Sequence, residues 1–221
     1  ELQGALVLAD TATGEVRALV GDRDGDRPGF NRAIHARRQV GSVIKPLVYL
    51  LALEHPDSYN LLTRIEDAPI PLRQPDGSTW SPDNFDKVSH GRVSLLEALT
   101  LSYNQATVRL GLEVGVNSMV SRIAQLGVNA DVDPVPSVFL GAVELTPLEV
   151  TQVYQSLANG GFSVPLRSVI AVQTSGGDEL VRYPMRLLPQ SHREAIGVLN
   201  DDAIPHPRWL QCAPPACFRP F

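Results

Sequence analysis

Ser42 and Lys45 are the two residues whose types and spacing most clearly allow chemistry. They open an apolar segment of helical length, residues 42–54, so we expect the hydroxyl and the amine on one helical face, one turn apart. Serine becomes a nucleophile when a neighbouring base takes its proton, and an amine can be that base when desolvation lowers its pKa. The helix N-terminus would favour negative charge on an attacked carbonyl group. The pair therefore predicts nucleophilic attack on a carbonyl carbon.

An N-cap serine followed by a surface lysine is the alternative interpretation of this pair. The sequence contains only two lysines, Lys45 and Lys87, and its other basic side chains are nearly all arginines. A lysine inside an apolar helix is unusual unless its amine has a specific partner. We therefore favour the catalytic interpretation.

A second polar arm could come from either of two Ser-Tyr-Asn segments, residues 58–60 and 102–104. A hydroxyl and an amide two positions apart can move a proton toward a leaving amine and hold peptide groups of a substrate. Ser58 lies past the far end of the predicted helix, roughly 18 Å from Ser42 at 1.5 Å per residue. Ser102 lies between two predicted helices, where a short loop can point into a cleft. An N-cap role for Ser102, in a helix beginning near Gln105, stays open.

The elements that would position these groups follow from local patterns. A β-rich run at residues 4–9, a turn and an alternating segment at residues 15–20 predict a hairpin, and segments 164–173 and 179–188 on either side of a turn predict a second one. Helical periodicity predicts helices over 42–54, 94–102, 105–114 and 118–126. Thr146, Pro147 and Glu149 form the capping pattern of one further helix, closed by glycines 160 and 161. Residues 68–90 are rich in Pro, Asp, Gly and Ser, which predicts a long surface loop of the kind that often carries function.

The composition fits one globular domain of 221 residues, with 43% hydrophobic and 19% charged residues. A net charge of -5 with scattered arginines argues against nucleic acid as a partner. No apolar run reaches the roughly 20 residues of a membrane span. The chain starts at Glu1 without a leader, so we expect any export signal or anchor to lie upstream.

The order of motifs along the chain resembles the penicilloyl serine transferases, specifically the transpeptidase domain of bifunctional class A penicillin-binding proteins of the 1B type. The resemblance extends to about residue 188 and rests on Phe30-Asn31-Arg32-Ala33, Arg38-Gln39-Val40-Gly41-Ser42-Val43-Ile44-Lys45-Pro46, Ser81-Pro82-Asp83-Asn84, Ser102-Tyr103-Asn104, Leu140-Gly141 and Glu144-Leu145-Thr146-Pro147-Leu148-Glu149. An ordered series of this length does not arise by chance. We assign residues 1–190 to a partial transpeptidase domain and residues 191–221 to a proline-rich tail without family resemblance.

The resemblance implies an α+β fold with a central antiparallel sheet and a mostly helical lobe, incomplete at its C-terminus. It implies a peptidoglycan D,D-transpeptidase, in which Ser42 is acylated by a D-Ala-D-Ala stem peptide and an amine of a neighbouring stem takes the acyl group. Lys45 would be the general base, Ser102 the proton relay, and Asn104 a partner of the substrate and of Lys45. β-Lactams would acylate Ser42 as substrate mimics, and no metal or organic cofactor is implied. The expected substrate-binding residues are Gly41, Trp80, Asn84 and Tyr103. For Trp80, which lies in the long polar loop, anchoring of that loop is the alternative.

The parent protein would be anchored in the bacterial inner membrane, facing the periplasm, and would work with other cell-wall synthesis proteins. The family's third motif, Lys followed by Thr or Ser and then Gly, is absent from the sequence. In relatives the strand that carries it would follow residue 221. Because one oxyanion donor is worth about a hundred- to a thousandfold in rate, we predict impaired activity, and also exposed apolar sheet surface. A non-catalytic β-lactam sensor and a D,D-carboxypeptidase are the alternatives.

Metal binding is disfavoured. A zinc site from His206, Cys212 and Cys217 would have three ligands at irregular spacing in the proline-rich tail. Three further histidines, His35, His55 and His90, form no cluster in the sequence and are expected in the core.

Overall fold

The computed structural model describes residues 2–24, 29–73 and 77–183. These residues form two compact units. The first unit comprises residues 2–24, 29–37, 124–129 and 145–183, and the second comprises residues 38–73, 77–123 and 130–144.

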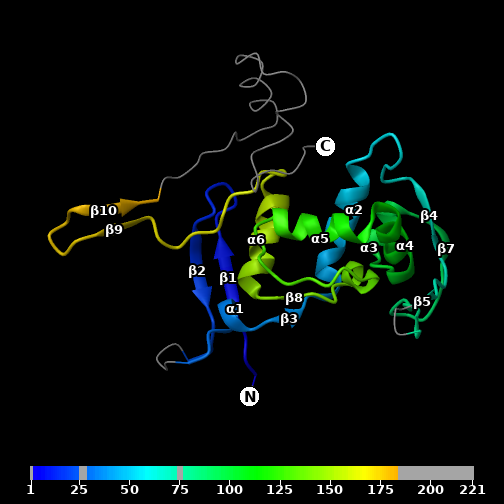
Figure 1. The fold of residues 1–221 in the computed structure, drawn as a ribbon, viewed down its shortest axis with the longest axis horizontal. Coiled ribbons are helices and arrows are strands. Elements are labelled where there is room, and N and C mark those ends of the chain that lie inside the picture. Colours follow the sequence, from blue (N-terminus) through cyan, green and yellow to red (C-terminus); the bar gives the residue numbers. More distant parts are fainter. Residues whose placement is uncertain (1, 25–28, 74–76, 184–221) are drawn as a thin grey trace, which may run out of the picture. The chain divides into compact units, whose positions relative to one another are not determined.

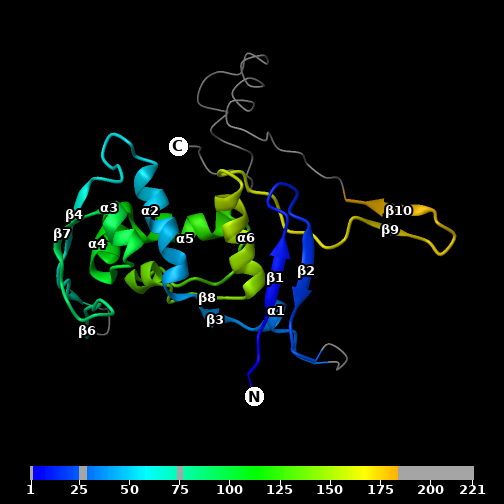
Figure 2. The ribbon, with the colours of Figure 1, turned by 180° about the vertical axis from the view of Figure 1, so that it is seen from behind.

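The first unit contains the predicted N-terminal hairpin. Strands β1 (Leu6–Ala9) and β2 (Val16–Val20) pair antiparallel, with Leu6 opposite Val20. Helix α6 (Pro147–Ala158) packs against β1, and the short helix α1 (Arg32–His35) packs against α6, as Figures 1 and 2 show from opposite sides. Helix α1 was not predicted, because its four residues lie within a polar stretch. It forms because the Asn31 side chain accepts a hydrogen bond from the Ala33 amide at its first turn.

Helix α6 begins with the predicted capping box. The Thr146 hydroxyl accepts the Glu149 amide at 3.2 Å, and the Glu149 carboxylate accepts the Thr146 amide at 2.8 Å. Pro147 occupies the first turn, where its missing N–H leaves no partner unsatisfied. The helix buries Val153 and Gln155 on its inner face. The prediction for this element is confirmed.

The second predicted hairpin is present as β9 (Ala171–Gln173) and β10 (Glu179–Arg182), which pair antiparallel. The part of the expected hairpin beyond residue 183 lies outside the described residues. Apolar side chains of both hairpins are exposed; Leu6 and Leu8 have exposed fractions of 54% and 56%. The predicted exposure of apolar sheet surface is therefore confirmed for β1.

The second unit has a helical core. It contains the 3-10 helix η1 (Gly41–Ile44), α2 (Lys45–Leu53), α3 (Leu95–Thr100), α4 (Asn104–Val114), most of α5 (Val116–Gln125) and the 3-10 helix η2 (Pro136–Leu140). Helix α2 packs against α3 and α4, and α4 packs against η2. At Gly111 of α4 an added Cβ would lie 2.4 Å from the Phe139 ring, so this position needs glycine for close helix packing. The predicted helices are confirmed, although the first turn of the 42–54 segment is 3-10.

Short strands complete the second unit. β4 (Arg64–Asp67) pairs antiparallel with β7 (Gly91–Ser94) and packs against α4, and β5 (Leu72–Arg73) pairs with β6 (Thr79–Trp80). β3 (Arg38–Gln39) also lies in this unit, whereas the two residues of β8 (Glu144–Leu145) are divided between the units. The β4–β7 pair was not predicted because three of the four β4 residues are charged. Strand β4 nevertheless alternates between buried and exposed side chains: Ile65 and Asp67 are buried, whereas Arg64 and Glu66 are exposed.

None of the helices in the described part of the chain combines the length and apolar composition that a membrane crossing requires.

Candidate active site

The Lys45 side chain is buried, with an exposed fraction of 1%. It is the first residue of α2, and its amine donates to the Ser102 carbonyl oxygen at 2.7 Å, Ser102 Oγ at 3.0 Å and Asn104 Oδ1 at 2.6 Å. An ammonium group has three hydrogens, so these acceptors satisfy it completely. The interpretation of Lys45 as a surface lysine is therefore wrong. The Ser-Tyr-Asn segment at residues 102–104 binds its amine.

The first Ser-Tyr-Asn segment has no part in this cluster. The Asn60 side chain accepts the Leu62 amide in a turn, and the Tyr59 hydroxyl donates to Glu113. The two segments share a sequence pattern, but only the segment at 102–104 contacts Lys45.

Burial lowers the pKa of Lys45 from 10.5 to about 8, and the negative charge of Asp67 partly offsets that shift. At this pKa, about a tenth of the molecules hold a neutral amine at pH 7. A neutral amine has a lone pair, and Ser102 Oγ can then donate to it rather than accept from it. Lys45 can therefore accept a proton near neutral pH.

Ser42 lies in η1, and its side chain is exposed. Its carbonyl oxygen accepts the Lys45 backbone amide, which places the two residues one turn apart as expected. Within the described residues the Ser42 hydroxyl makes no side-chain hydrogen bond, so the expected contact with the amine is not a direct hydrogen bond here. Catalytic hydrogen bonds often become short only when substrate is bound.

The backbone before Ser42 is held by a segment about a hundred residues further along the chain. The Gly41 amide donates to the Gly141 carbonyl at 3.3 Å, and the Val40 amide donates to the Val143 carbonyl at 3.1 Å. Gly141 has a φ of +81°, and a Cβ there would lie 2.1 Å from the Gly41 carbonyl oxygen. Gly141 therefore positions the backbone at Val40 and Gly41, directly before Ser42. In the sequence, Gly141 was noted only as part of the family motif Leu140-Gly141, and its role in positioning this loop was not predicted.

Ser102 has a left-handed backbone conformation, with a φ of +58°. It follows the end of α3, where its amide donates to the Leu99 carbonyl and the Tyr103 amide donates to the Ala98 carbonyl. This is the Schellman arrangement, in which glycine usually occupies the left-handed position. A serine there carries strain of the kind that often accompanies function. The N-cap of α4 is Tyr103, so the alternative in which Ser102 caps that helix is wrong.

Asn84 is buried and binds the first turn of α4. Its Oδ1 accepts the Asn104 amide at 2.7 Å and the Gln105 amide at 3.3 Å, while its Nδ2 donates to Asp67 and to the Val88 carbonyl. These bonds use every hydrogen-bonding group of the Asn84 side chain. They also position Asn104.

The three other residues that were expected to bind substrate are partly accessible to solvent. Trp80 is half-buried on β6, Tyr103 is half-buried between α3 and α4, and Gly41 is partly exposed before Ser42. Of the histidines expected in the core, His35 and His55 are exposed and His90 is half-buried, so that expectation was wrong.

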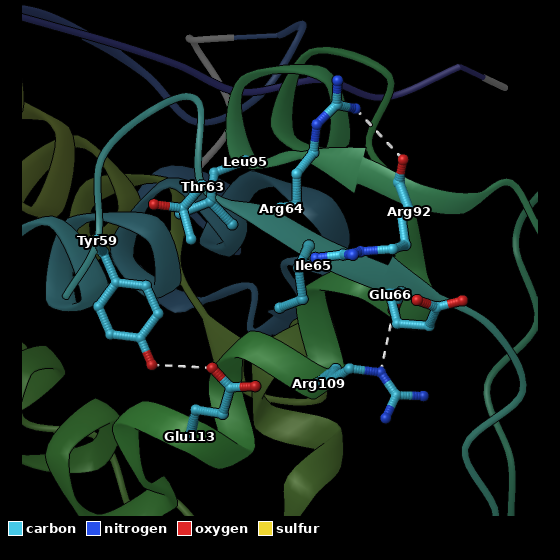
Figure 3. Close-up of a pocket in the computed structure, with 9 residues that line it drawn as sticks. All are labelled: Tyr59, Thr63, Arg64, Ile65, Glu66, Arg92, Leu95, Arg109 and Glu113. Carbon is cyan, nitrogen blue, oxygen red and sulfur yellow. Dashed lines mark hydrogen bonds between the residues drawn. The ribbon is translucent and has the colours of Figure 1, made fainter.

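A separate pocket lies on β4, β7 and α4 (Figure 3). It contains three arginines, Arg64, Arg92 and Arg109, and none of the predicted site residues. Figure 3 shows the guanidinium groups of Arg64 and Arg109 pointing away from each other, and Arg109 Nε donates to the Glu66 carbonyl at 3.0 Å. The arginines therefore do not converge on one ligand position.

No group of three His, Cys, Asp or Glu side chains that could hold a metal ion is present in residues 2–24, 29–73 and 77–183. The zinc alternative at His206, Cys212 and Cys217 lies outside the described residues.

The fold is that of the penicilloyl serine transferases. Penicillin-binding protein 1A from Haemophilus influenzae superposes with a TM-score of 0.75 at 28% sequence identity, over 84% of this chain and 28% of that protein. Residues 4–194 match the family model of the penicillin binding protein transpeptidase domain, and the chain belongs to this family.

The sequence is also similar to two proteins named penicillin-binding protein 1B. The protein from Vibrio cholerae is 44% identical over 181 residues, which are 81% of this chain and 23% of the relative. The protein from Escherichia coli K12 is 49% identical over 196 residues, which are 87% of this chain and 23% of the relative. The chain thus spans about a quarter of the length of these curated relatives.

Proposed function

We propose that the chain carries the acyl-transfer centre of a peptidoglycan D,D-transpeptidase and that β-lactams acylate Ser42. The observation that carries this proposal is the buried Lys45 amine, held by Ser102 and Asn104 one turn from an exposed serine. Family membership and the similarity to penicillin-binding proteins 1B support the same chemistry.

In the first half-reaction, Ser42 Oγ attacks the carbonyl carbon of the penultimate D-Ala of a stem peptide. The proton of the hydroxyl passes to the neutral Lys45 amine, and Ser102 relays a proton to the nitrogen of the departing D-Ala. The new Ser42 ester replaces the broken peptide bond. Asn104 holds the lysine and is the proposed contact for the substrate's amide groups.

In the second half-reaction, an amine of a neighbouring stem attacks the ester carbon. The bond to Ser42 Oγ breaks, a cross-link forms, and a proton from the attacking amine returns to Ser42. No metal or organic cofactor enters either step of this proposal.

The substrate-binding roles of Gly41, Trp80 and Tyr103 remain part of the proposal. For Asn84 we propose an indirect role, because its polar atoms are engaged by the protein and two of its bonds hold the start of α4. The parent protein would act at the periplasmic face of the bacterial inner membrane, with peptidoglycan stem peptides as substrates and other cell-wall synthesis proteins as partners.

Fluorescent penicillin followed by peptide mass spectrometry tests the proposal directly. We expect covalent label on Ser42, no label in Ser42→Ala, and strongly slowed labelling in Ser102→Ala. Ser58→Ala is the matched control, because it alters the equivalent serine of the other Ser-Tyr-Asn segment, and it should label like the wild type. Equal labelling of wild type and Ser42→Ala would refute the assignment of the nucleophile.

A second measurement separates the functional alternatives. Incubation with a pentapeptide stem and an acceptor amine should release D-Ala and give a cross-linked dimer. Release of D-Ala without dimer would favour a carboxypeptidase. Slow acylation by penicillin with no release of D-Ala would favour a β-lactam-binding module without catalytic turnover.

A further inference from the structure

Asp67 is a fully buried carboxylate at the end of β4. Its Oδ1 accepts the Ala106 amide of the first turn of α4 at 3.0 Å. Its Oδ2 accepts from Asn84 Nδ2 at 2.7 Å and from the His90 amide at 2.9 Å. A buried carboxylate is costly unless such donors surround it, so this cluster is tightly constrained. One carboxylate thereby connects β4, the loop before β7 and the start of α4.

The His90 ring lies between two carboxylates and an aromatic ring. Its Nδ1 is 2.8 Å from Asp67 Oδ2, and because a carboxylate only accepts, Nδ1 carries the hydrogen. Its Nε2 is 3.1 Å from the Asp86 carboxylate. The ring stacks on Tyr103, with centroids 4.0 Å apart and planes tilted by 12°. His90 is therefore fixed in orientation and covers one face of Tyr103.

Tyr103 stands between the two residues that hold the Lys45 amine. Its neighbour Ser102 has a strained left-handed backbone, which persists only when the surrounding structure enforces it. The Tyr103 carbonyl accepts the Thr107 hydroxyl at 2.6 Å, so both its backbone and its ring are constrained. Movement of Tyr103 would displace Ser102 Oγ and Asn104 Oδ1 together.

We propose that Asp67 and His90 are positioning residues of the acylation centre: Asp67 holds the first turn of α4, and His90 supports the Tyr103 ring. Together they keep Ser102 and Asn104 on the Lys45 amine. Neither residue contacts Ser42 or the reacting atoms. The inference rests on the proposed function, because it assigns these residues to the same reaction.

The charge of Asp67 affects the pKa values of both His90 and Lys45, and these can be measured. The ionisable groups that face the His90 ring are Asp67 from β4, Asp86 from the preceding loop and Tyr103 from the α3–α4 junction. The hydrogen bond to Asp67 is the main cause that raises the pKa of His90, which favours the imidazolium form. Asp67 also raises the pKa of Lys45. Removing the Asp67 charge should therefore lower the pKa of Lys45 further.

The first test measures the Lys45 pKa by NMR in the full chain labelled with ¹³C-lysine. Only two signals arise, and exposed Lys87 is the internal reference. We expect Asp67→Asn to lower the Lys45 pKa by about half a unit or more. Asp57→Asn and His55→Asn alter exposed residues of the same unit and should leave it unchanged. An unchanged or raised Lys45 pKa in Asp67→Asn would overturn the proposed link between the Asp67 charge and the Lys45 amine.

The second test measures the rate of Ser42 acylation by fluorescent penicillin. His90→Leu removes both hydrogen bonds and should slow acylation about tenfold or more, because small displacements in a catalytic site have large effects on rate. His90→Asn keeps a donor for Asp67 and should restore most of the rate, and His55→Leu should match the wild type. Wild-type acylation in His90→Leu would overturn the positioning role. If the wild type itself does not react, the proposed function fails, while the lysine titration still decides whether this cluster acts on Lys45.

Discussion

Replacing Lys45 by methionine should change how the free energy of unfolding depends on pH. The native pKa of Lys45 is about 8, whereas a lysine in the unfolded chain titrates near 10.5. Between these values the unfolded state binds more protons than the native state, so stability rises with pH over that range. Below pH 8 the buried ammonium lowers the free energy of unfolding by a nearly constant amount.

The expected size of the effect follows from the pKa difference. At 1.36 kcal/mol per unit, burial of the charged amine costs about 3 kcal/mol at pH 7 and about 2 kcal/mol at pH 9. The wild type should therefore gain about 1 kcal/mol over this interval relative to Lys45→Met, which has no amine to titrate. All other ionisable groups are common to both proteins, so their contributions cancel in the comparison.

Urea denaturation followed by circular dichroism at pH 7, 8 and 9 measures this difference. Lys87→Met is the matched control, because the Lys87 side chain is 74% exposed and its curve should run parallel to that of the wild type. Parallel curves for the wild type and Lys45→Met would show that the amine titrates normally, which would contradict its role as a base near neutral pH.

Three further predictions concern the site and its supports. The rate of Ser42 acylation should rise about tenfold from pH 6 to pH 7 and level off above pH 8, as the Lys45 amine loses its proton. Gly141→Ala should reduce both stability and acylation strongly, because the new Cβ would collide with the Gly41 carbonyl; thermal unfolding and penicillin labelling measure the two effects. Glu54→Gln should cost about 3 kcal/mol in urea unfolding, because it leaves the largely buried Arg122 without the carboxylate that binds it at two positions.

Each of these predictions has a matched control. For the pH profile, Lys45→Arg should be inactive at every pH, since a guanidinium stays protonated; a pH-dependent rate in this variant would contradict the base assignment. Gly77→Ala shares the positive φ without a nearby atom and should cost far less than Gly141→Ala. Glu179→Gln breaks an exposed pair with Arg182 and should cost less than about 1 kcal/mol; an equal loss in both glutamate variants would show that burial is unimportant.

Local spacing was enough to predict the placement of Ser42 and Lys45 one turn apart and most of the helices. Ser42 and Lys45 are one turn apart whatever surrounds them, and Thr146 and Glu149 form a capping box within a single turn. The choice of Ser102 over Ser58 also followed from chain geometry. The turn spacing and the capping box depend on neighbours within a few residues, and the sequence records such neighbours directly.

Tertiary structure decided which remote groups support those local patterns. Asn84 and Asp67 bind the first turn of α4 from 20 and 39 residues away, and Gly141 fixes the loop before Ser42. Local patterns do not show what these residues contact, because the contacts depend on the path of the whole chain rather than on local propensity. For the same reason the left-handed conformation of Ser102, which no serine prefers by itself, is visible only in the folded protein.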